Sequence, residues 1–292
     1  MYNQIASNKL KSYLLMLLFF LVLVGIVWAW SLYFGQDSSY GAVIFAVILA
    51  TTMNLISFYA GDSIALSIAG AKPIEKEQNP YVFRMVENLS ITAGLPTPKI
   101  YIINDSSMNA FATGRDPKHS SIALTTGIIE GLENEELEGV IAHELSHIKN
   151  YDIRLMMVVI VCVGVIALMA DWLTRSLFWR HRDNDNRNNN GIFMLIGLVL
   201  AILSPLFAKL IQLAISRKRE FLADASGALL TRYPEGLARA LEKISSQKQA
   251  LKKANQATAH LYIANPFGRE KMANLFSTHP PIAQRIASLR SM

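Results

Sequence analysis

Two long apolar stretches near the start of the chain constrain its fold more than any other feature. The first runs from about Tyr13 to Phe34 and the second from about Tyr40 to Ala60. Each approaches the roughly 20 residues that a helix needs to cross a bilayer. Two lysines precede the first stretch, so the positive-inside rule predicts a transmembrane hairpin over residues 1–60 with its N-terminus in the cytoplasm. The apolar core is too long for a cleaved signal peptide, and we expect a retained anchor.

Two further apolar stretches follow later, from about Leu155 to Trp179 and from about Ile192 to Ile215. If both span the bilayer, Arg180, Arg182 and Arg187 lie on its outer side, against the positive-inside rule. The alternative is that these helices are partly buried in the protein or lie shallowly at the interface. Of the two alternatives we favour two spans; the 52% share of hydrophobic residues indicates membrane insertion of the chain in general. The predicted fold is therefore a mainly helical, α+β integral membrane protein with about four transmembrane helices.

The segment from His143 to His147 reads His-Glu-Leu-Ser-His, an HExxH motif. On a helix, positions i and i+4 lie one turn apart on the same face, so the two imidazoles can converge on one metal ion. Glu144 projects beside them and can act as a general base without being a ligand. Apolar residues at spacings of three and four continue the helix on both sides of the motif, and Asn134 is the expected N-cap. The alternative is a surface helix with two incidental histidines, but polar groups in so apolar a helix need partners.

A catalytic zinc site usually takes three protein ligands, so a third must come from elsewhere in the chain. The best candidate is Glu220, which stands four residues before Asp224 and on the same helical face. Asp224 could then accept the free N–H of a zinc-bound histidine and orient its ring. The alternative is a charge cluster that solvates the end of a membrane span. The sequence alone leaves both alternatives open. A shared metal site requires the two motifs to lie on the same side of the membrane, and either zero or two crossings between them would satisfy this.

Between the hairpin and the HExxH helix the sequence indicates mixed α and β structure. Helical periodicity covers residues 80–93, and a short β-rich run covers 100–103. Residues 109–113 and 121–125 read as two strands around a turn-rich segment. Such a hairpin could present an edge strand to which a peptide substrate adds as a further strand. It could equally be an ordinary hairpin that only covers the helix.

These motifs together make the chain similar to the HtpX-type heat-shock metalloproteases of bacterial inner membranes, a family related to the CAAX prenyl endopeptidases. The resemblance rests on the N-terminal hairpin, the HExxH helix and the sequence Asn-Ala-Phe-Ala-Thr-Gly at residues 109–114. It also rests on the Glu220 to Asp224 segment and on the dipeptide His279-Pro280. HExxH alone is a generic motif, whereas its combination with the other segments is specific.

The resemblance implies a zinc-dependent endopeptidase with a zincin-type cytoplasmic catalytic domain that carries a small β-sheet next to the HExxH helix. It implies one zinc ion per chain, with Glu220 as the third ligand. It also implies action on misfolded or damaged membrane proteins from the cytoplasmic side of the bacterial inner membrane, in protein quality control. The remaining implied site residues are an oxyanion-stabilising histidine and an edge strand that binds substrate: His279, Asn109, Ala110, Phe111 and Ala112.

In the mechanism that follows, zinc held by His143, His147 and Glu220 activates a water molecule, and Glu144 takes the proton of that water. No acyl-enzyme forms, so Cys162 is not needed as a nucleophile. One alternative is a non-catalytic membrane scaffold with a structural zinc site, although such sites are usually closed by four ligands that commonly include cysteine. Another is a transporter, for which the charged residues within the apolar stretches are few.

The predicted organisation has four parts: residues 1–60 form the transmembrane hairpin, 61–154 the first part of the catalytic domain, 155–216 the second hydrophobic helical pair, and 217–292 the second part of the catalytic domain. The formal net charge of +6 needs no nucleic acid as a partner. Basic residues beside the spans are more simply explained as anchors near anionic lipid. We expect the membrane and polypeptide substrates as partners.

Overall fold

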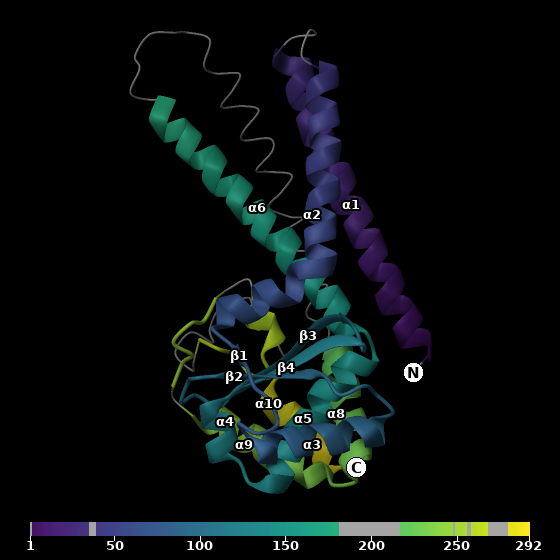
Figure 1. The fold of residues 1–292 in the computed structure, drawn as a ribbon, viewed down its shortest axis with the longest axis vertical. Coiled ribbons are helices and arrows are strands. Elements are labelled where there is room, and N and C mark those ends of the chain that lie inside the picture. Colours follow the sequence, from purple (N-terminus) through teal and green to yellow (C-terminus); the bar gives the residue numbers. More distant parts are fainter. Residues whose placement is uncertain (1, 35–38, 181–216, 248, 256–257, 268–279) are drawn as a thin grey trace.

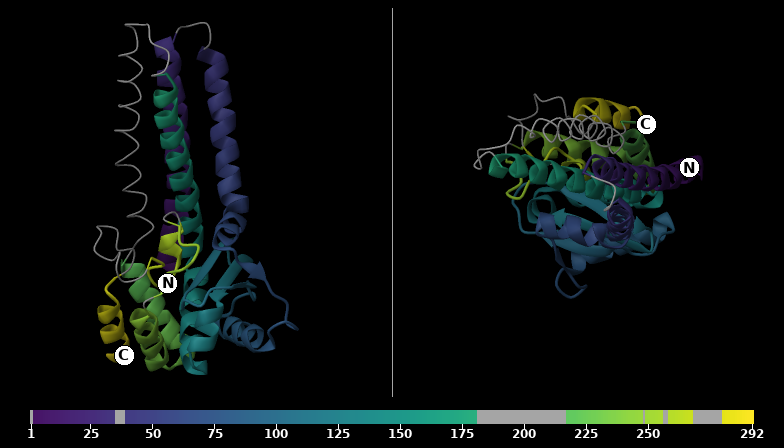
Figure 2. Two further views of the ribbon diagram at one scale, coloured as in Figure 1. Left: turned by 90° about the vertical axis from the view of Figure 1, so that its left-hand side faces the viewer. Right: turned by 90° about the horizontal axis from the view of Figure 1, so that it is seen from above.

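The computed structural model describes residues 2–34, 39–180, 217–247, 249–255, 258–267 and 280–292. Three long helices extend away from a compact domain that contains the sheet and the shorter helices (Figure 1). The same separation is seen when the molecule is turned by 90° (Figure 2). The fourth predicted span, at about 192–215, and the loop before it lie outside the described residues, as does His279.

The first two long helices are α1, Tyr2–Phe34, and α2, Ser39–Ala69. Both contain a segment that is long and apolar enough to cross a membrane, Gln4–Trp28 in α1 and Val43–Ala69 in α2. Large apolar side chains on both helices face away from the protein: the exposed fraction is 54% for Leu14, 60% for Ile44 and 63% for Phe45. Side chains of this kind need apolar surroundings, which a bilayer provides.

The third long helix is α6, Asp152–Arg180, which begins just after the HExxH helix and packs against α1 and α2. Leu155, Val158 and Cys162 of α6 form a buried cluster with Leu15 and Phe19 of α1. The third predicted apolar stretch therefore continues a helix that starts at the compact domain. Cys162 is a buried free thiol in this cluster, where it packs as a small apolar side chain.

The compact domain contains a four-stranded sheet in the order β1-β2-β4-β3. The strands are β1, Lys72–Pro73; β2, Lys99–Ile103; β3, Ala110–Asp116; and β4, His119–Thr125. β2 and β4 are parallel, and the other two pairs are antiparallel. β3 therefore lies at one edge of the sheet, where it packs against α5, Asn134–Lys149.

The β3–β4 hairpin is longer than its sequence indicated, because its strands extend through most of the expected turn. Gly114 lies within β3 with a φ of 136°, beside a register shift between Gly114 and Asp116. A Cβ at Gly114 would collide with the backbone of His119. Glycine permits both the backbone angle and the close approach, so the strands continue past the irregularity.

The remaining helices surround α5 and close the core. They are α3, Pro80–Ala93; α4, Thr126–Gly131; α8, Arg217–Thr231; α9, Pro234–Ser246; a 3₁₀ turn η2, Ala259–Leu261; and α10, Ile282–Arg290. The helix predicted over residues 80–93 is α3, and Pro80 starts it, as proline favours at a first helical position. Apolar side chains of α3, α5, α9 and the sheet form one buried core.

The central helix α5 is held closely on two sides. A Cβ added at Gly139 would lie 2.7 Å from the backbone nitrogen of Leu237, which places α9 directly against α5. At its start, Asn134 is the first helical residue and not the N-cap that its sequence suggested. The carboxylate of Glu136 instead accepts a hydrogen bond of 2.9 Å from the N–H of Glu133, the residue before the helix. Tight packing and this cap fix the helix that carries the HExxH motif.

Candidate metal centre

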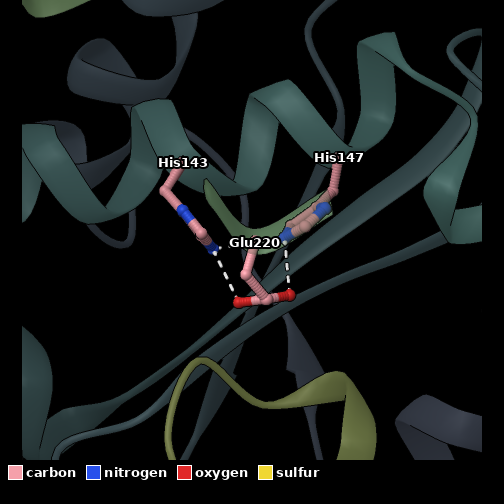
Figure 3. A group of neighbouring side chains, drawn as sticks. All are labelled: His143, His147 and Glu220. Atoms are coloured by element: carbon pink, nitrogen blue, oxygen red, sulfur yellow. Dashed lines mark hydrogen bonds and ion pairs between the residues drawn. The ribbon is translucent and has the colours of Figure 1, made fainter. Parts of the chain in front are cut away.

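Helices α5 and α8 bring together the three side chains that the sequence indicated as metal ligands. His143 and His147 project from one face of α5, and both are at least 94% buried, with exposed fractions of 1% and 6%. Glu220 reaches them from α8 (Figure 3). Its Oε2 lies 3.8 Å from Nε2 of His143 and its Oε1 lies 3.6 Å from Nε2 of His147. The ligand atoms of the three residues all lie within 4.8 Å of one another.

The close approach of the two helices depends on a small residue. Gly227, two turns after Glu220 on α8, faces the backbone of α5. A Cβ added there would lie 3.0 Å from the backbone nitrogen of His143 and 3.2 Å from its Cα. The two motifs are far apart along the chain, but this packing places the carboxylate of Glu220 on α8 opposite both imidazoles of α5.

Each imidazole is oriented by a carboxylate on its other nitrogen. Nδ1 of His143 lies 2.9 Å from Oδ1 of Asp224, and Nδ1 of His147 lies 2.9 Å from Oδ2 of Asp152. A proton on each Nδ1 satisfies these contacts and leaves both Nε2 lone pairs directed at the space beside Glu220. Asp224 thus contacts the free ring nitrogen of a candidate ligand, as its spacing from Glu220 suggested. Asp152 was not among the residues predicted from the sequence.

Arg285 of α10 is a further buried member of the site that sequence reasoning missed. Its guanidinium donates to both oxygens of Asp224, at 2.8 and 2.7 Å, and its Nη1 lies 3.4 Å from Oε2 of Glu220. Burial by itself would raise the pKa of Asp224, but the guanidinium of Arg285 and the contact with His143 hold it well below its usual range. Asp224 therefore stays ionised behind His143.

The N-terminal helix also reaches this centre. Nδ2 of Asn8, on α1, donates to Oδ1 of Asp152 at 2.7 Å and to the backbone oxygen of Asn150 at 2.9 Å. Nε of Arg219 lies 3.8 Å from the same Oδ1 of Asp152. Asp152 thus contacts His147 with one carboxylate oxygen and Asn8 with the other. Helix α1 therefore contacts the residue that orients the candidate ligand His147.

Glu144 lies beside the two histidines and is 1% exposed. Its carboxylate accepts a hydrogen bond from the backbone N–H of Ala112 on β3. Burial raises the pKa of Glu144, and the neighbouring imidazoles oppose this increase only in part. Burial would lower the pKa of His147, but its hydrogen bond with Asp152 and the charge of Glu220 raise it to about 9. The pocket as a whole therefore favours a cation between the imidazoles.

The residue types at this centre fit a zinc ion. Two imidazoles and one carboxylate form the ligand set of many catalytic zinc sites, which keep a fourth position for water or substrate. Four carboxylates line the buried centre against two guanidinium groups: Glu144, Asp152, Glu220 and Asp224 against Arg219 and Arg285. Their formal charges leave an excess of two negative charges, which a divalent cation would balance.

The predicted edge strand lies next to this centre. The side chain of Asn109 and the carbonyl of Ala110 contact the backbone of residues 263 and 264, and the ring of Phe111 packs edge to face on Tyr262 with centroids 5.0 Å apart. Ala112 contacts Glu144, as described above. Ala112 therefore lies beside the candidate general base, whereas the other three residues contact a segment of the chain's own C-terminal part.

The buried His-His-Glu cluster beside a small sheet defines a metallopeptidase, and the comparisons with known proteins agree. Residues 76–292 match the model of peptidase family M48, and the chain belongs to this family. The Protease HtpX homolog of Dictyoglomus turgidum is 46% identical over 291 residues, which cover 100% of this chain and 94% of that protein. The Protease HtpX homolog of Streptococcus uberis is 41% identical over 297 residues, with 100% of both chains covered. The chain is therefore a metalloprotease, and the resemblance to HtpX-type proteases is confirmed.

A crystal structure of Ste24p from S. mikatae has a similar fold. The TM-score is 0.50 at 19% sequence identity, and the match covers 99% of this chain and 67% of that chain. At this identity the likeness concerns the fold alone. It agrees with the expectation of a mainly helical fold that carries a small sheet.

Proposed function

We propose that the chain is a membrane-bound zinc endopeptidase that hydrolyses peptide bonds of misfolded or damaged membrane proteins from the cytoplasmic side, in membrane protein quality control. The observation that carries this proposal is the convergence of His143, His147 and Glu220, with Nδ1 of each histidine 2.9 Å from a buried carboxylate. Imidazoles oriented in this way are prepared to bind a metal ion without further rearrangement of their rings.

His143, His147 and Glu220 would hold the ion, and Asp224 and Asp152 would keep the two imidazoles in the required tautomer. When bound, zinc supplies Lewis acidity toward a peptide carbonyl and toward water. Arg285 keeps Asp224 ionised and lies against Glu220, so it fixes the position of both carboxylates. Each of these residues thus has a defined part in building the site.

Glu144 is the residue that would move the proton. It would accept a proton from water and return it to the leaving amine, and its raised pKa makes it a stronger base than an exposed glutamate. The N–H of Ala112 lies beside the carboxylate of Glu144, which places this carboxylate next to the edge strand β3 and the two imidazoles. No residue of the mechanism needs to form a covalent bond with the substrate, so the buried Cys162 has no part in it.

The membrane setting follows from the way the apolar helices meet the domain. Asn8 of α1 donates to Asp152, the first residue of α6 and the partner of His147, so the site is adjacent to the end of α1, a helix that is long and apolar enough to cross a membrane. Lys9 and Lys11 stand at this end of α1, which favours its placement on the cytoplasmic side. Polypeptides that emerge from the same membrane would be the nearest substrates.

The substitution Glu144→Gln tests this function. It removes the base but leaves the three candidate ligands, so we expect the purified variant to contain one zinc ion per chain and to lose cleavage of a membrane-protein substrate. Glu138→Gln, the same change on the same helix but away from the site, is the matched control and should keep both properties. Cleavage by zinc-loaded Glu144→Gln at the wild-type rate would contradict the mechanism. Wild-type protein that binds zinc but cleaves nothing would favour the alternative of a non-catalytic scaffold.

A further inference from the structure

A short segment of the C-terminal part of the chain lies along the outer edge of β3. It begins after the turn η2 and comprises Tyr262, Ile263 and Ala264. The N–H of Ile263 donates to the carbonyl of Ala110 at 2.9 Å. β4 occupies the other side of β3, so this bond forms on the side where a strand added to the sheet would pair.

The side chain of Asn109 binds the next residue of the segment in the same way that a neighbouring strand would. Its Nδ2 donates to the carbonyl of Ala264 at 3.1 Å, and its Oδ1 accepts from the N–H of Ala264 at 3.4 Å. Both polar backbone groups of Ala264 are thus satisfied by one amide side chain. Contacts of this type involve only the main chain of the bound residue and do not depend on its side chain.

The carbonyl between these two contacts points at the candidate metal centre. The oxygen of Ile263 accepts from Nη1 of Arg285 at 3.3 Å, and the same Nη1 lies 3.4 Å from Oε2 of Glu220. Further along β3, the N–H of Ala112 is bound to Glu144. The segment therefore contacts the sheet edge two residues from the neighbour of the candidate general base, and Arg285 contacts both the segment and the candidate ligand Glu220.

We propose that Asn109, the Ala110 carbonyl and Arg285 form the binding site for two successive residues of an extended peptide substrate, and that Ile263 and Ala264 fill this site as an internal ligand that the substrate displaces. This inference rests on the proposed protease function and specifies how that site recognises its substrate. The segment also indicates the substrate class: a β-strand-like peptide with an aliphatic residue at the position of Ile263 and a small residue at that of Ala264.

The internal ligand is held by contacts that a peptide can replace one for one. Every backbone hydrogen bond described for Ile263 and Ala264 uses a main-chain group, and any extended peptide carries the same groups. The side chain of Ile263 is 2% exposed and packs into the main core, so the site offers an apolar pocket to the residue that takes its place. A substrate residue of similar size would restore this packing.

Hydrogen exchange tests the displacement on the unaltered full-length protein. The zinc-loaded protein in detergent micelles is incubated with a saturating peptide hydroxamate, and deuterium uptake is followed in the fragment that covers residues 258–267. We expect faster exchange of the amides of Ile263 and Ala264 when the hydroxamate binds, and unchanged uptake in α9. Unchanged protection of residues 258–267 under a hydroxamate that is shown by titration to be bound would overturn the proposal and make the segment a fixed part of the core.

The substitution Ile263→Pro provides a second test through kinetics. It removes the N–H that donates to Ala110, and Tyr262 already has the φ of −70° and ψ of 145° that a following proline requires. Loss of one competing hydrogen bond predicts a KM for an unstructured fluorogenic peptide that is lower by about fivefold. Ile263→Val keeps the N–H, so its shift in KM should be smaller than that of the proline variant. A folded, zinc-loaded Ile263→Pro protein with an unchanged or higher KM would overturn the proposal.

Failure of this inference can be distinguished from failure of the proposed function. If the wild-type protein cleaves the peptide but neither the exchange nor the KM shift is observed, the internal-ligand proposal is wrong and the protease function stands. If the zinc-loaded wild-type protein does not cleave the peptide or a membrane-protein substrate, the protease function itself is wrong.

Discussion

The contact between Asp152 and His147 makes a quantitative prediction about metal binding. Asp152 is 1% exposed, and its Oδ2 lies 2.9 Å from Nδ1 of His147. The substitution Asp152→Asn keeps the size of the side chain but removes its negative charge. His147 would then lose a charged acceptor for its Nδ1 proton, and its ring would be a weaker and less well oriented ligand.

The size of the effect follows from the type of interaction that is lost. A hydrogen bond to a charged group contributes about 1.5–3 kcal/mol, and each 1.4 kcal/mol corresponds to about a tenfold change in a binding constant. We therefore expect the dissociation constant for zinc to rise about 10- to 100-fold in Asp152→Asn. The substitution Asn8→Ala removes the 2.7 Å bond that orients Asp152 from α1, together with the bond to the backbone oxygen of Asn150, but leaves the carboxylate of Asp152 in place, so its effect should be about three- to tenfold.

The assay is a competition between the full-length protein and a zinc-selective fluorescent chelator at a series of buffered free zinc concentrations. The matched control is Ser12→Ala on the same helix. Ser12 is buried and bonds to the backbone oxygen of Asn8 at 2.8 Å, but it has no contact with Asp152 among the described bonds. Its zinc affinity should equal that of the wild type. A wild-type zinc affinity in Asp152→Asn would refute the assignment of His147 as a ligand positioned by Asp152.

Three further results are expected. Arg285→Leu leaves the carboxylate of Asp224 buried without its guanidinium partner and should lower the free energy of unfolding by about 3–5 kcal/mol in urea titrations. Arg290→Leu, which breaks an exposed ion pair, should have a far smaller effect, and equal effects of the two substitutions would contradict the buried-pair argument. Gly227→Ala places a Cβ 3.0 Å from the backbone nitrogen of His143 and should destabilise the protein by about 1–3 kcal/mol. Gly164→Ala is the control, because a Cβ there meets no atom of the described residues within 4 Å and should not change the stability. An unchanged stability of Gly227→Ala would show that α5 and α8 can separate at no cost. Removal of metal by EDTA should abolish cleavage and lower the thermal unfolding midpoint, and added zinc should restore both. The midpoint falls because a ligand at about 1,000 times its Kd stabilises the folded state by about 4 kcal/mol. Cleavage that persists at zero zinc content would contradict a metal-dependent reaction.

Local patterns in the sequence were sufficient to predict the parts of the site that lie on single helices. The spacing of His143 and His147 and that of Glu220 and Asp224 are properties of one helical turn, so no knowledge of the tertiary structure was needed. The helices over 80–93 and around the HExxH motif were predicted for the same reason.

The supporting residues could not be predicted, because their positions depend on the tertiary structure. Asp152 reaches His147 from the start of the next helix, after a break at Tyr151, which has a φ of 59°. Arg285 looks like an ordinary polar residue of a short amphipathic helix, and only the packing of α10 buries it between Asp224 and Glu220. Asn8 lies 144 residues before Asp152 in the chain, at the start of an apolar helix that the sequence assigned to the membrane alone.

The edge of β3 shows a different limit of sequence reasoning. The strand character of residues 109–113 was predicted, and β3 does lie at an edge of the sheet. No pattern in the residues indicated that Ile263 and Ala264 would contact the same edge, because backbone hydrogen bonds between distant segments leave no periodic signal. The proposed substrate-binding edge could therefore be described only from the arrangement of the C-terminal segment.

Zinc-edge X-ray absorption on the purified full-length protein tests the central assignment most directly. The account predicts one zinc ion per chain with two imidazole nitrogens at about 2.0–2.1 Å, oxygen ligands that complete the coordination, and no sulfur. The imidazole contribution should decrease in His147→Ala. A sulfur ligand, or an unchanged zinc spectrum in His147→Ala, would contradict a metal centre built from His143, His147 and Glu220.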